Sequence, residues 1–198
     1  MKAPHSPPAG ATPLDPDELA GLIPSHVSTQ GERNEVEQAN LVKALSWAER
    51  KHAAVLSDEF LRRLHQRMFG EVWRWAGTYR KTGKNIGVPA HEIAPALRVL
   101  CADTGYWIEH QVYPWIELGA RFHHRLACIH AFPNGNGRHA RLMTDILLRQ
   151  HGEVTFTWGA LAWAAGERQD EAVRKTYLDA LRTADRGDLE PLCLFVCR

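Results

Sequence analysis

Apolar side chains recur at intervals of three and four residues along most of this chain, a spacing that places them on one face of an α-helix. The first such pattern begins near Asn34. A second begins at Ser57, a residue type that caps helices, and ends at Gly70. Further helical patterns follow over about 90–110, 114–129, 142–148, 159–165, 168–183 and 188–197. This periodicity predicts an all-α fold.

Residues 77–88 differ from the rest of the chain. Short β-compatible pieces flank the turn-forming sequence Thr82-Gly83-Lys84-Asn85. Two extended pieces around such a turn are typical of a β-hairpin. The predicted fold is therefore all-α with one small β-hairpin.

The chain is predicted to form one domain with a flexible N-terminal arm. Residues 1–17 are rich in proline, alanine and glycine and have little to bury. The remaining residues, 18–198, show no internal repeat and no clear sign of a second domain. We expect a single domain there, with a core at about 57–195 and an N-terminal helical extension at about 28–52.

The composition is that of an ordinary globular protein. Hydrophobic residues make up 44% of the chain, charged residues 24%, and the formal net charge is +1. This near-neutral charge argues against direct nucleic-acid binding as the main function. The sequence has no apolar run of membrane-spanning length, and Met1 to Thr12 lacks a hydrophobic signal core. We therefore expect a cytoplasmic protein that does not bind membranes.

The four cysteines show no pattern that indicates metal binding or redox chemistry. They are Cys101, Cys128, Cys193 and Cys197, and they form neither a CxxC pair nor a zinc-type spacing with histidine. We predict that all four are reduced and structural.

The densest group of chemistry-bearing residues lies between His130 and Arg141. Gly135 and Gly137 allow backbone conformations that a Cβ would obstruct, so consecutive N–H groups can converge on an anion. A helical pattern follows, so this loop lies at a helix N-terminus, where unpaired N–H groups and the helix dipole favour phosphate.

Three side chains of the same run extend this chemistry. Arg138 and Arg141 can donate planar, charge-assisted hydrogen bonds to phosphate oxygens. His130 has an ordinary pKa suited to proton transfer near neutral pH. Taken singly, each residue is also consistent with a simple connector between helices. Together they predict a phosphate-binding loop with a base beside it.

This run resembles the signature of the Fic family, His-x-Phe-x-(Asp/Glu)-Gly-Asn-Gly-Arg-x-x-Arg, and departs from it at Asn134. Residues 72–80 resemble the Trp-Ala-Gly-x-Tyr-Arg segment before the family's β-hairpin flap. Residues 184–192 resemble a segment common after its last core helices. Residues 31–40 resemble the branch called mobile mystery protein B.

The resemblance implies a protein adenylyltransferase, which moves AMP from ATP to a Ser, Thr or Tyr hydroxyl of a target protein. His130 would be the general base for the attacking hydroxyl. The phosphate-binding residues would be Asn134, Gly135, Asn136, Gly137, Arg138 and Arg141. Among them, the Asn136 side chain would hold α- and β-phosphate oxygens, while Arg138 would bind near the β-phosphate and Arg141 at the γ-phosphate.

The resemblance also implies that the hairpin is a flap, which pairs with an extended target segment by β-augmentation. The flap and target-binding residues would be Arg80, Lys81, Thr82, Gly83, Lys84, Asn85 and Ile86.

Asn134 stands where the family usually has the acidic ligand of Mg²⁺. An amide oxygen carries no negative charge, so the affinity for Mg²⁺ or Mn²⁺ should fall. Slower transfer, a different metal or nucleotide, and binding without turnover are all open outcomes. We favour a working but weakened transferase. The alternatives are a non-catalytic or regulatory nucleotide-binding module, or a Fic enzyme that transfers or removes another phosphate-containing group.

Many Fic proteins are inhibited by a glutamate that pairs with the second arginine of the signature, in the setting (Ser/Thr)-x-x-x-Glu-(Gly/Asn). Ser28 and Glu32 have this spacing, whereas Arg33 departs from the last position. We hypothesise that Glu32 reaches Arg141 and inhibits the protein. The alternative is an acid that only lies near a helix N-terminus, where acids are favoured.

The branch resemblance further implies a bacterial, toxin-like protein of a mobile element. Any link to DNA would then come through a neighbouring helix-turn-helix partner protein.

Overall fold

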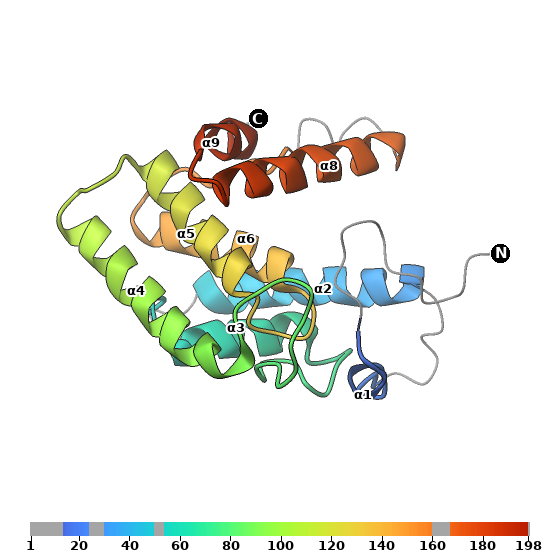
Figure 1. Ribbon diagram of the computed structural model, residues 1–198. Coiled ribbons are helices and arrows are strands. Elements are labelled where there is room, and N and C mark those ends of the chain that lie inside the picture. The colour runs from blue at the N-terminus through green and yellow to red at the C-terminus, as the bar shows by residue number, and fades with distance from the viewer. Residues whose placement is uncertain (1–13, 24–29, 50–53, 160–166, 198) are drawn as a thin grey trace.

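The computed structural model describes residues 14–23, 30–49, 54–159 and 167–197, with side chains from residue 40 onward in the second range and from 172 onward in the last. None of the described helices is both long enough and apolar enough to cross a membrane. Within these ranges there is no strand, which confirms the all-α prediction. The helices are α1 (Pro16–Leu19), α2 (Gln30–Glu49), α3 (Asp58–Phe69), the 3₁₀ helix η1 (Ala90–Glu92), α4 (Ile93–Glu109), α5 (Trp115–Ile129), α6 (Asn136–Gln150), α8 (Glu167–Ala184) and α9 (Glu190–Val196) (Figure 1).

Helices α5 and α6 form the centre of the molecule. In Figure 1, α8 and α9 lie above this pair, and α2 and α3 lie below it. Phe122 of α5 and Met143 and Leu147 of α6 are buried in the main core together with Leu64 of α3. Because side chains packed in this way have little freedom, the facing ends of α5 and α6, and the loop between them, are held in place.

A second, smaller core attaches α8 and α9 to the outer side of α5. Tyr177 of α8, Leu192 and Phe195 of α9 and Ala120 of α5 are buried in it. This packing brings residues from near the C-terminus close to the loop between α5 and α6.

The helix boundaries follow local signals where those signals are strong. The hydroxyl of Ser57 caps α3 by accepting a hydrogen bond of 3.2 Å from the amide of Phe60, and Gly70 follows the last residue of α3, as predicted. Helix α6 begins at Asn136, earlier than its apolar pattern indicated, because polar residues form its first turns. The helix predicted over 159–165 lies outside the described residues except for Gly159.

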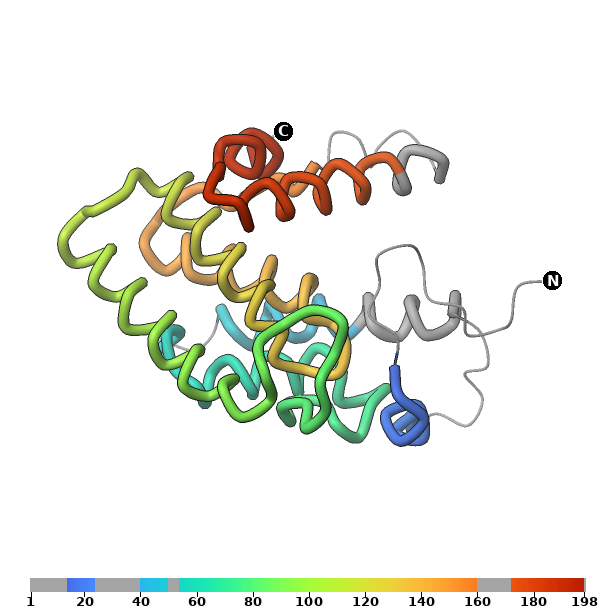
Figure 2. The backbone as a smooth tube through the Cα atoms, viewed as in Figure 1, coloured from blue at the N-terminus to red at the C-terminus, as the bar shows by residue number. Residues whose placement is uncertain are grey.

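The predicted β-hairpin is wrong: residues 77–88 form a loop without strand pairing. The amide of Arg80 donates to the carbonyl of Ala131 at 3.0 Å, and the amide of Val88 donates to the carbonyl of Ile129 at 3.3 Å. Both ends of the loop therefore bond to the segment after α5 instead of to each other. Figure 2 shows this green loop against the turn between α5 and α6.

The described N-terminal segment, residues 14–23, packs on the chain that follows α3. The amide of Ile23 donates to the carbonyl of Val72 at 2.8 Å, and the indole of Trp75 donates to the carbonyl of Glu18 at 2.9 Å. Residues 14–17 of the predicted arm belong to this attached segment, while residues 1–13 lie outside the described residues.

Candidate active site

His130 ends α5 in a conformation that is unusual for a residue with a side chain. Its φ of 53° and ψ of 55° are left-handed, and its side chain is almost fully buried. A non-glycine residue held in this region costs about 1–3 kcal/mol, and such strain concentrates at functional sites. The conformation turns the chain sharply between α5 and the loop that leads to α6.

The electrostatic surroundings keep the His130 imidazole neutral at pH 7. Burial lowers its pKa to about 4, and the positive charge of Arg80 acts in the same direction, against a hydrogen bond with the backbone of Ala127. A neutral imidazole can accept a proton, so the residue has the protonation state that a general base requires.

Asn136 holds the loop in shape instead of pointing toward a ligand. Its Oδ1 accepts from the amide of Phe132 at 2.9 Å, and its Nδ2 donates to the carbonyl of Phe132 at 2.7 Å. The buried side chain is thus occupied at both ends. Its donor serves the backbone in this conformation, and the prediction that the Asn136 side chain binds phosphate stays a prediction.

The backbone of the same loop does provide a place for an anion. The hydrogen-bond ladder of α6 begins with His139, whose amide donates to the carbonyl of Gly135 at 2.9 Å. The amides of Asn136 and Gly137 come before this bond, at the helix N-terminus, where N–H groups have no intrahelical acceptor. Gly135 has a φ of 79°, and a Cβ there would lie 2.6 Å from the ring of Phe69, so only glycine fits.

His65 on α3 supports this loop from below, and sequence reasoning missed it. Its Nδ1 accepts from the amide of Gly77 at 3.0 Å, so its proton is on Nε2, which donates to the carbonyl of Asn134 at 3.0 Å. The ring stacks on Phe132 with centroids 3.7 Å apart. A histidine on the apolar face of a predicted helix was the available signal, because a buried polar group must find partners.

Asn134 does not fit the role of a magnesium ligand. Its Oδ1 accepts a hydrogen bond of 2.6 Å from the amide of Gly135, which turns the side chain onto its own loop. The loop from His130 to Arg141 contains no carboxylate. Because Mg²⁺ in nucleotide sites is usually bound through one or two carboxylates, this chain lacks the expected ligand.

Positive charge gathers on the α6 and α8 side of the loop. The guanidinium of Arg138 lies over the ring of Phe69 at 4.8 Å, and that of Arg141 lies over the ring of Tyr177 at 5.4 Å. Burial lowers the pKa of Arg141; Tyr177 opposes this effect, while the charges of Arg138 and Arg174 reinforce it. No acidic side chain within the described ranges forms an ion pair with Arg141. The pattern around the signature gave no sign of Arg174, since it lies on a different helix.

The loop of residues 77–88 divides into inward and outward residues. Arg80 is buried, and the ammonium of Lys84 lies 2.8 Å from Asp15 and 2.6 Å from Glu18. Although burial opposes the charge, these two carboxylates raise the pKa of Lys84. Arg80 and Lys84 are therefore used within the chain. The other predicted target-facing residues are exposed: Lys81, Thr82, Gly83, Asn85 and Ile86.

The predicted inhibitory residues are not described by the structure. Ser28 lies outside the described residues, and so does the side chain of Glu32, although its backbone belongs to α2. Inhibition through Arg141 stays a prediction.

Residues 55–148 match the Fic/DOC family. This chain contains a Fic domain. The match runs from the start of α3 to Leu148 near the end of α6, includes the whole loop from His130 to Arg141, and ends before α8. Tyr177, which lies against Arg141, and Arg174, whose charge acts on it, therefore belong to a helix beyond the matched residues. The mobile mystery protein B branch stays a prediction.

Two curated relatives are both named protein adenylyltransferase Fic. The protein from Nematostella vectensis is 29% identical over 155 residues, which cover 75% of this chain and 33% of the relative. The protein from Culex quinquefasciatus is 27% identical over 138 residues, covering 67% of this chain and 25% of the relative. This chain thus spans about a third or less of the length of these two relatives.

Solved structures share the fold of this Fic domain. Fic-1 (residues 134–508) from C. elegans superposes with a TM-score of 0.67 at 21% identity, over 90% of this chain and 51% of that chain. BepC from Bartonella tribocorum, a VirB-translocated effector protein with bound AMPPNP, has a TM-score of 0.67 at 16% identity, over 90% of this chain and 95% of that chain. At these identities the likeness concerns the fold.

Proposed function

We propose that this protein is an adenylyltransferase, which transfers AMP from ATP to a Ser, Thr or Tyr hydroxyl of a target protein. The curated relatives carry that name, and BepC has an ATP analogue bound. The single observation that carries the proposal is the buried His130, which is held in a left-handed conformation at the end of α5, one short loop before the N-terminus of α6.

In this reaction His130 accepts the proton of the target hydroxyl. The hydroxyl oxygen then attacks the α-phosphorus of ATP, a bond forms between them, and the bond from phosphorus to the bridging oxygen breaks. Pyrophosphate leaves with the electron pair of that bond. The nearby phosphates would raise the pKa of His130 toward neutrality, because negative charge favours the imidazolium ion. ATP itself thus makes the base stronger when it binds.

The phosphates would lie at the N-terminus of α6. The amides of Asn136 and Gly137 point toward that end of the helix, where the dipole adds to their effect. Arg138 and Arg141 would bind the β- and γ-phosphates, and Arg174 adds charge from α8. Since Asn136 is bonded to Phe132, its backbone amide and not its side chain would contact phosphate.

The loop from His130 to Arg141 offers no charged ligand for Mg²⁺ or Mn²⁺. Asn134 is neutral and bonded to Gly135, so a divalent ion would depend on the nucleotide phosphates for its charged ligands. Transfer should therefore be slow and should require a high concentration of the metal.

A target segment would bind along the exposed part of the loop. Lys81, Gly83, Asn85 and Ile86 face solvent there, and Ile86 is 48% exposed. Residues 83–87 lie between the hydrogen-bonded ends of the loop, and their backbone would pair with an extended peptide. Regulation by Glu32 and a helix-turn-helix partner protein stay part of this proposal.

The test uses ATP labelled on its α-phosphate, incubated with the purified protein and a bacterial lysate. Wild type should label a target protein, His130→Ala should not, and His91→Ala should label normally, because His91 is 81% exposed on η1 and outside the site. Equal labelling by His130→Ala would contradict the assigned base. Stronger labelling by Glu32→Gly would support inhibition by Glu32.

A second candidate function is a regulatory module that binds nucleotide without turnover. The hydrogen bond between Gly135 and Asn134 favours this candidate, because it engages the side chain that stands where the family has its metal ligand. ATP binding by calorimetry with no labelled product under any metal would support this candidate. A labelled product from a nucleotide other than ATP would instead indicate transfer of a different phosphate-containing group.

A further inference from the structure

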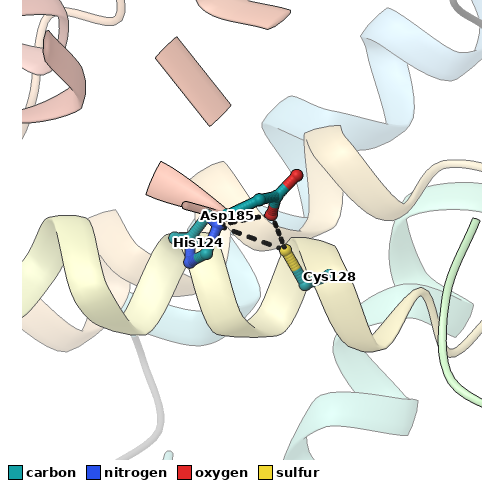
Figure 3. Close-up of side chains that lie close together, drawn as sticks. All are labelled: His124, Cys128 and Asp185. Atoms are coloured by element: carbon teal, nitrogen blue, oxygen red, sulfur yellow. Dashed lines mark hydrogen bonds and ion pairs between the residues drawn. The ribbon is translucent and has the colours of Figure 1, made fainter. Parts of the chain in front are cut away.

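Three side chains with metal-binding atoms meet where α8 ends against α5. His124 and Cys128 lie one turn apart on α5, and Asp185 directly follows α8 (Figure 3). The Nε2 of His124 lies 2.9 Å from Oδ1 of Asp185, and the Sγ of Cys128 lies 3.4 Å from Nε2 and 3.2 Å from Oδ1. One nitrogen, one sulfur and one oxygen thus form a compact triangle.

We propose that His124, Cys128 and Asp185 form a zinc-binding site outside the active site. Ligand atoms of a tetrahedral zinc ion lie roughly 3.4–3.6 Å apart, given bond lengths of about 2.0–2.3 Å. The three observed separations are at most about half an ångström shorter than this, so small side-chain rotations would admit the ion. Water would complete the coordination, because Cys128 and Asp185 are exposed.

The donor set selects the kind of metal. Thiolate and imidazole ligands suit Zn²⁺ and related transition metals, whereas Mg²⁺ requires oxygen ligands. The site is therefore not the magnesium site that the family signature implies, and it contains no residue of the loop from His130 to Arg141. The active site and this site would take different metals.

Zinc binding at this site releases a proton. The thiol of Cys128 must become a thiolate to bind Zn²⁺, and its proton passes to solvent as the sulfur–zinc bond forms. Asp185 binds as a carboxylate and His124 as a neutral imidazole, so the two anionic ligands, Cys128 and Asp185, balance the 2+ charge of the ion. The hydrogen bonds among the three side chains are replaced by bonds to the metal.

The position of the site implies that a bound zinc ion would link two helices. Asp185 follows the helix that carries Arg174 and Tyr177, and Cys128 lies two residues before His130. A bound ion would join the end of α8 to α5 directly. It would thus add a second attachment to the smaller core, which packs α8 and α9 on α5.

The experiment titrates the tag-free full chain with Co²⁺, which replaces Zn²⁺ and shows a thiolate-to-cobalt absorption band when cysteine binds it. We expect one Co²⁺ per chain, displacement of Co²⁺ by Zn²⁺, and a higher melting temperature with Zn²⁺. Cys128→Ser should abolish the band. Asp185→Asn should weaken Zn²⁺ binding roughly a hundredfold, while the exposed position of Asp185 lets the protein fold.

Cys197→Ser is the matched control, because Cys197 is also a free, exposed cysteine but lies at the end of α9. This variant should keep the band and the affinity of the wild type. Circular dichroism confirms that each variant is folded. Absence of the band in the wild type, its survival in Cys128→Ser, or its loss in Cys197→Ser would each overturn the proposal.

Discussion

The Nε of Arg80 donates a hydrogen bond of 2.6 Å to the carbonyl oxygen of His130. The same guanidinium donates to the carbonyl of Thr82 at 2.9 Å and to the carbonyl of Val88. One buried side chain therefore closes the loop of residues 77–88 and holds the strained residue that we propose as the base. Residues 77–88 and the loop that begins at His130 are thus joined into one hydrogen-bonded unit.

Replacing Arg80 with alanine should destabilise the protein strongly. Three carbonyls would lose a charged donor, and hydrogen bonds to charged groups are worth about 1.5–3 kcal/mol each, so we expect a loss of about 3 kcal/mol or more. The measurement is urea unfolding. Arg74→Ala is the control, because Arg74 is exposed in the neighbouring segment and should change stability little. Equal stability of both variants would show that the Arg80 hydrogen bonds contribute nothing.

Gly135 should not tolerate a side chain. Its φ is 79°, and a Cβ would meet the ring of Phe69 at 2.6 Å. Strain in this backbone region adds to the clash, so Gly135→Ala should cost about 2 kcal/mol and weaken ATP binding. Gly83→Ala is the matched control, since a Cβ there meets no atom within 4 Å. Thermal unfolding of the two variants gives the comparison, and a neutral Gly135→Ala would contradict it.

Lys84 should anchor the N-terminal segment to the loop of residues 77–88. Its ammonium is buried between Asp15 and Glu18, so Lys84→Ala leaves these two carboxylates without their partner. We expect hydrogen exchange of residues 14–23 to increase by at least about tenfold, which corresponds to about 1.4 kcal/mol. Lys43→Ala removes an exposed ion pair with Glu71 and should have no comparable effect. Unchanged exchange in Lys84→Ala would show that α1 is held by other contacts.

Stability should fall as the pH is lowered from about 6.5 to 4. Burial lowers the pKa of His123 to about 3 and of His130 and His139 to about 4, so below pH 6.5 the unfolded chain binds protons that the folded chain does not. The contribution of these histidines to the free energy of unfolding is complete above pH 6.5.

Asp145 acts in the opposite direction, because burial raises its pKa to about 6 and the folded state binds its proton first. The three histidines outweigh it, and each contributes on the order of 1 kcal/mol per pH unit. Urea unfolding between pH 7 and pH 4.5 measures the slope. A stability that rises toward pH 4.5 would refute the prediction.

An acid at position 134 should increase activity. Asn134→Asp restores the carboxylate of the family signature and provides Mg²⁺ with a charged ligand. We expect about tenfold faster AMP transfer at low Mg²⁺ concentration, with a smaller gain at saturating metal. Asn85→Asp adds the same charge on the exposed loop and should not reproduce this gain. No change in the metal dependence would show that position 134 does not bind the metal.

The helical fold and the signature loop were predictable because their signals are local. Ser57 caps α3 and Gly70 ends it through contacts within a few residues. The glycines between His130 and Arg141 likewise indicate a turn before a helix. The predicted hairpin failed for a different reason: residues 77–88 have the composition of a hairpin, but their backbone bonds to Ile129 and Ala131.

The sequence by itself determined where most of the helices and the loop from His130 to Arg141 lie, since helix periodicity, capping and glycine turns depend on near neighbours. The tertiary structure decided which side chains are already occupied. It bonds Asn136 to Phe132 and places His65 under Asn134. It also brings Asp185 to Cys128, 57 residues away. Hydrogen bonds of this kind depend on which segments meet when the core packs, and no spacing along the chain encodes that meeting.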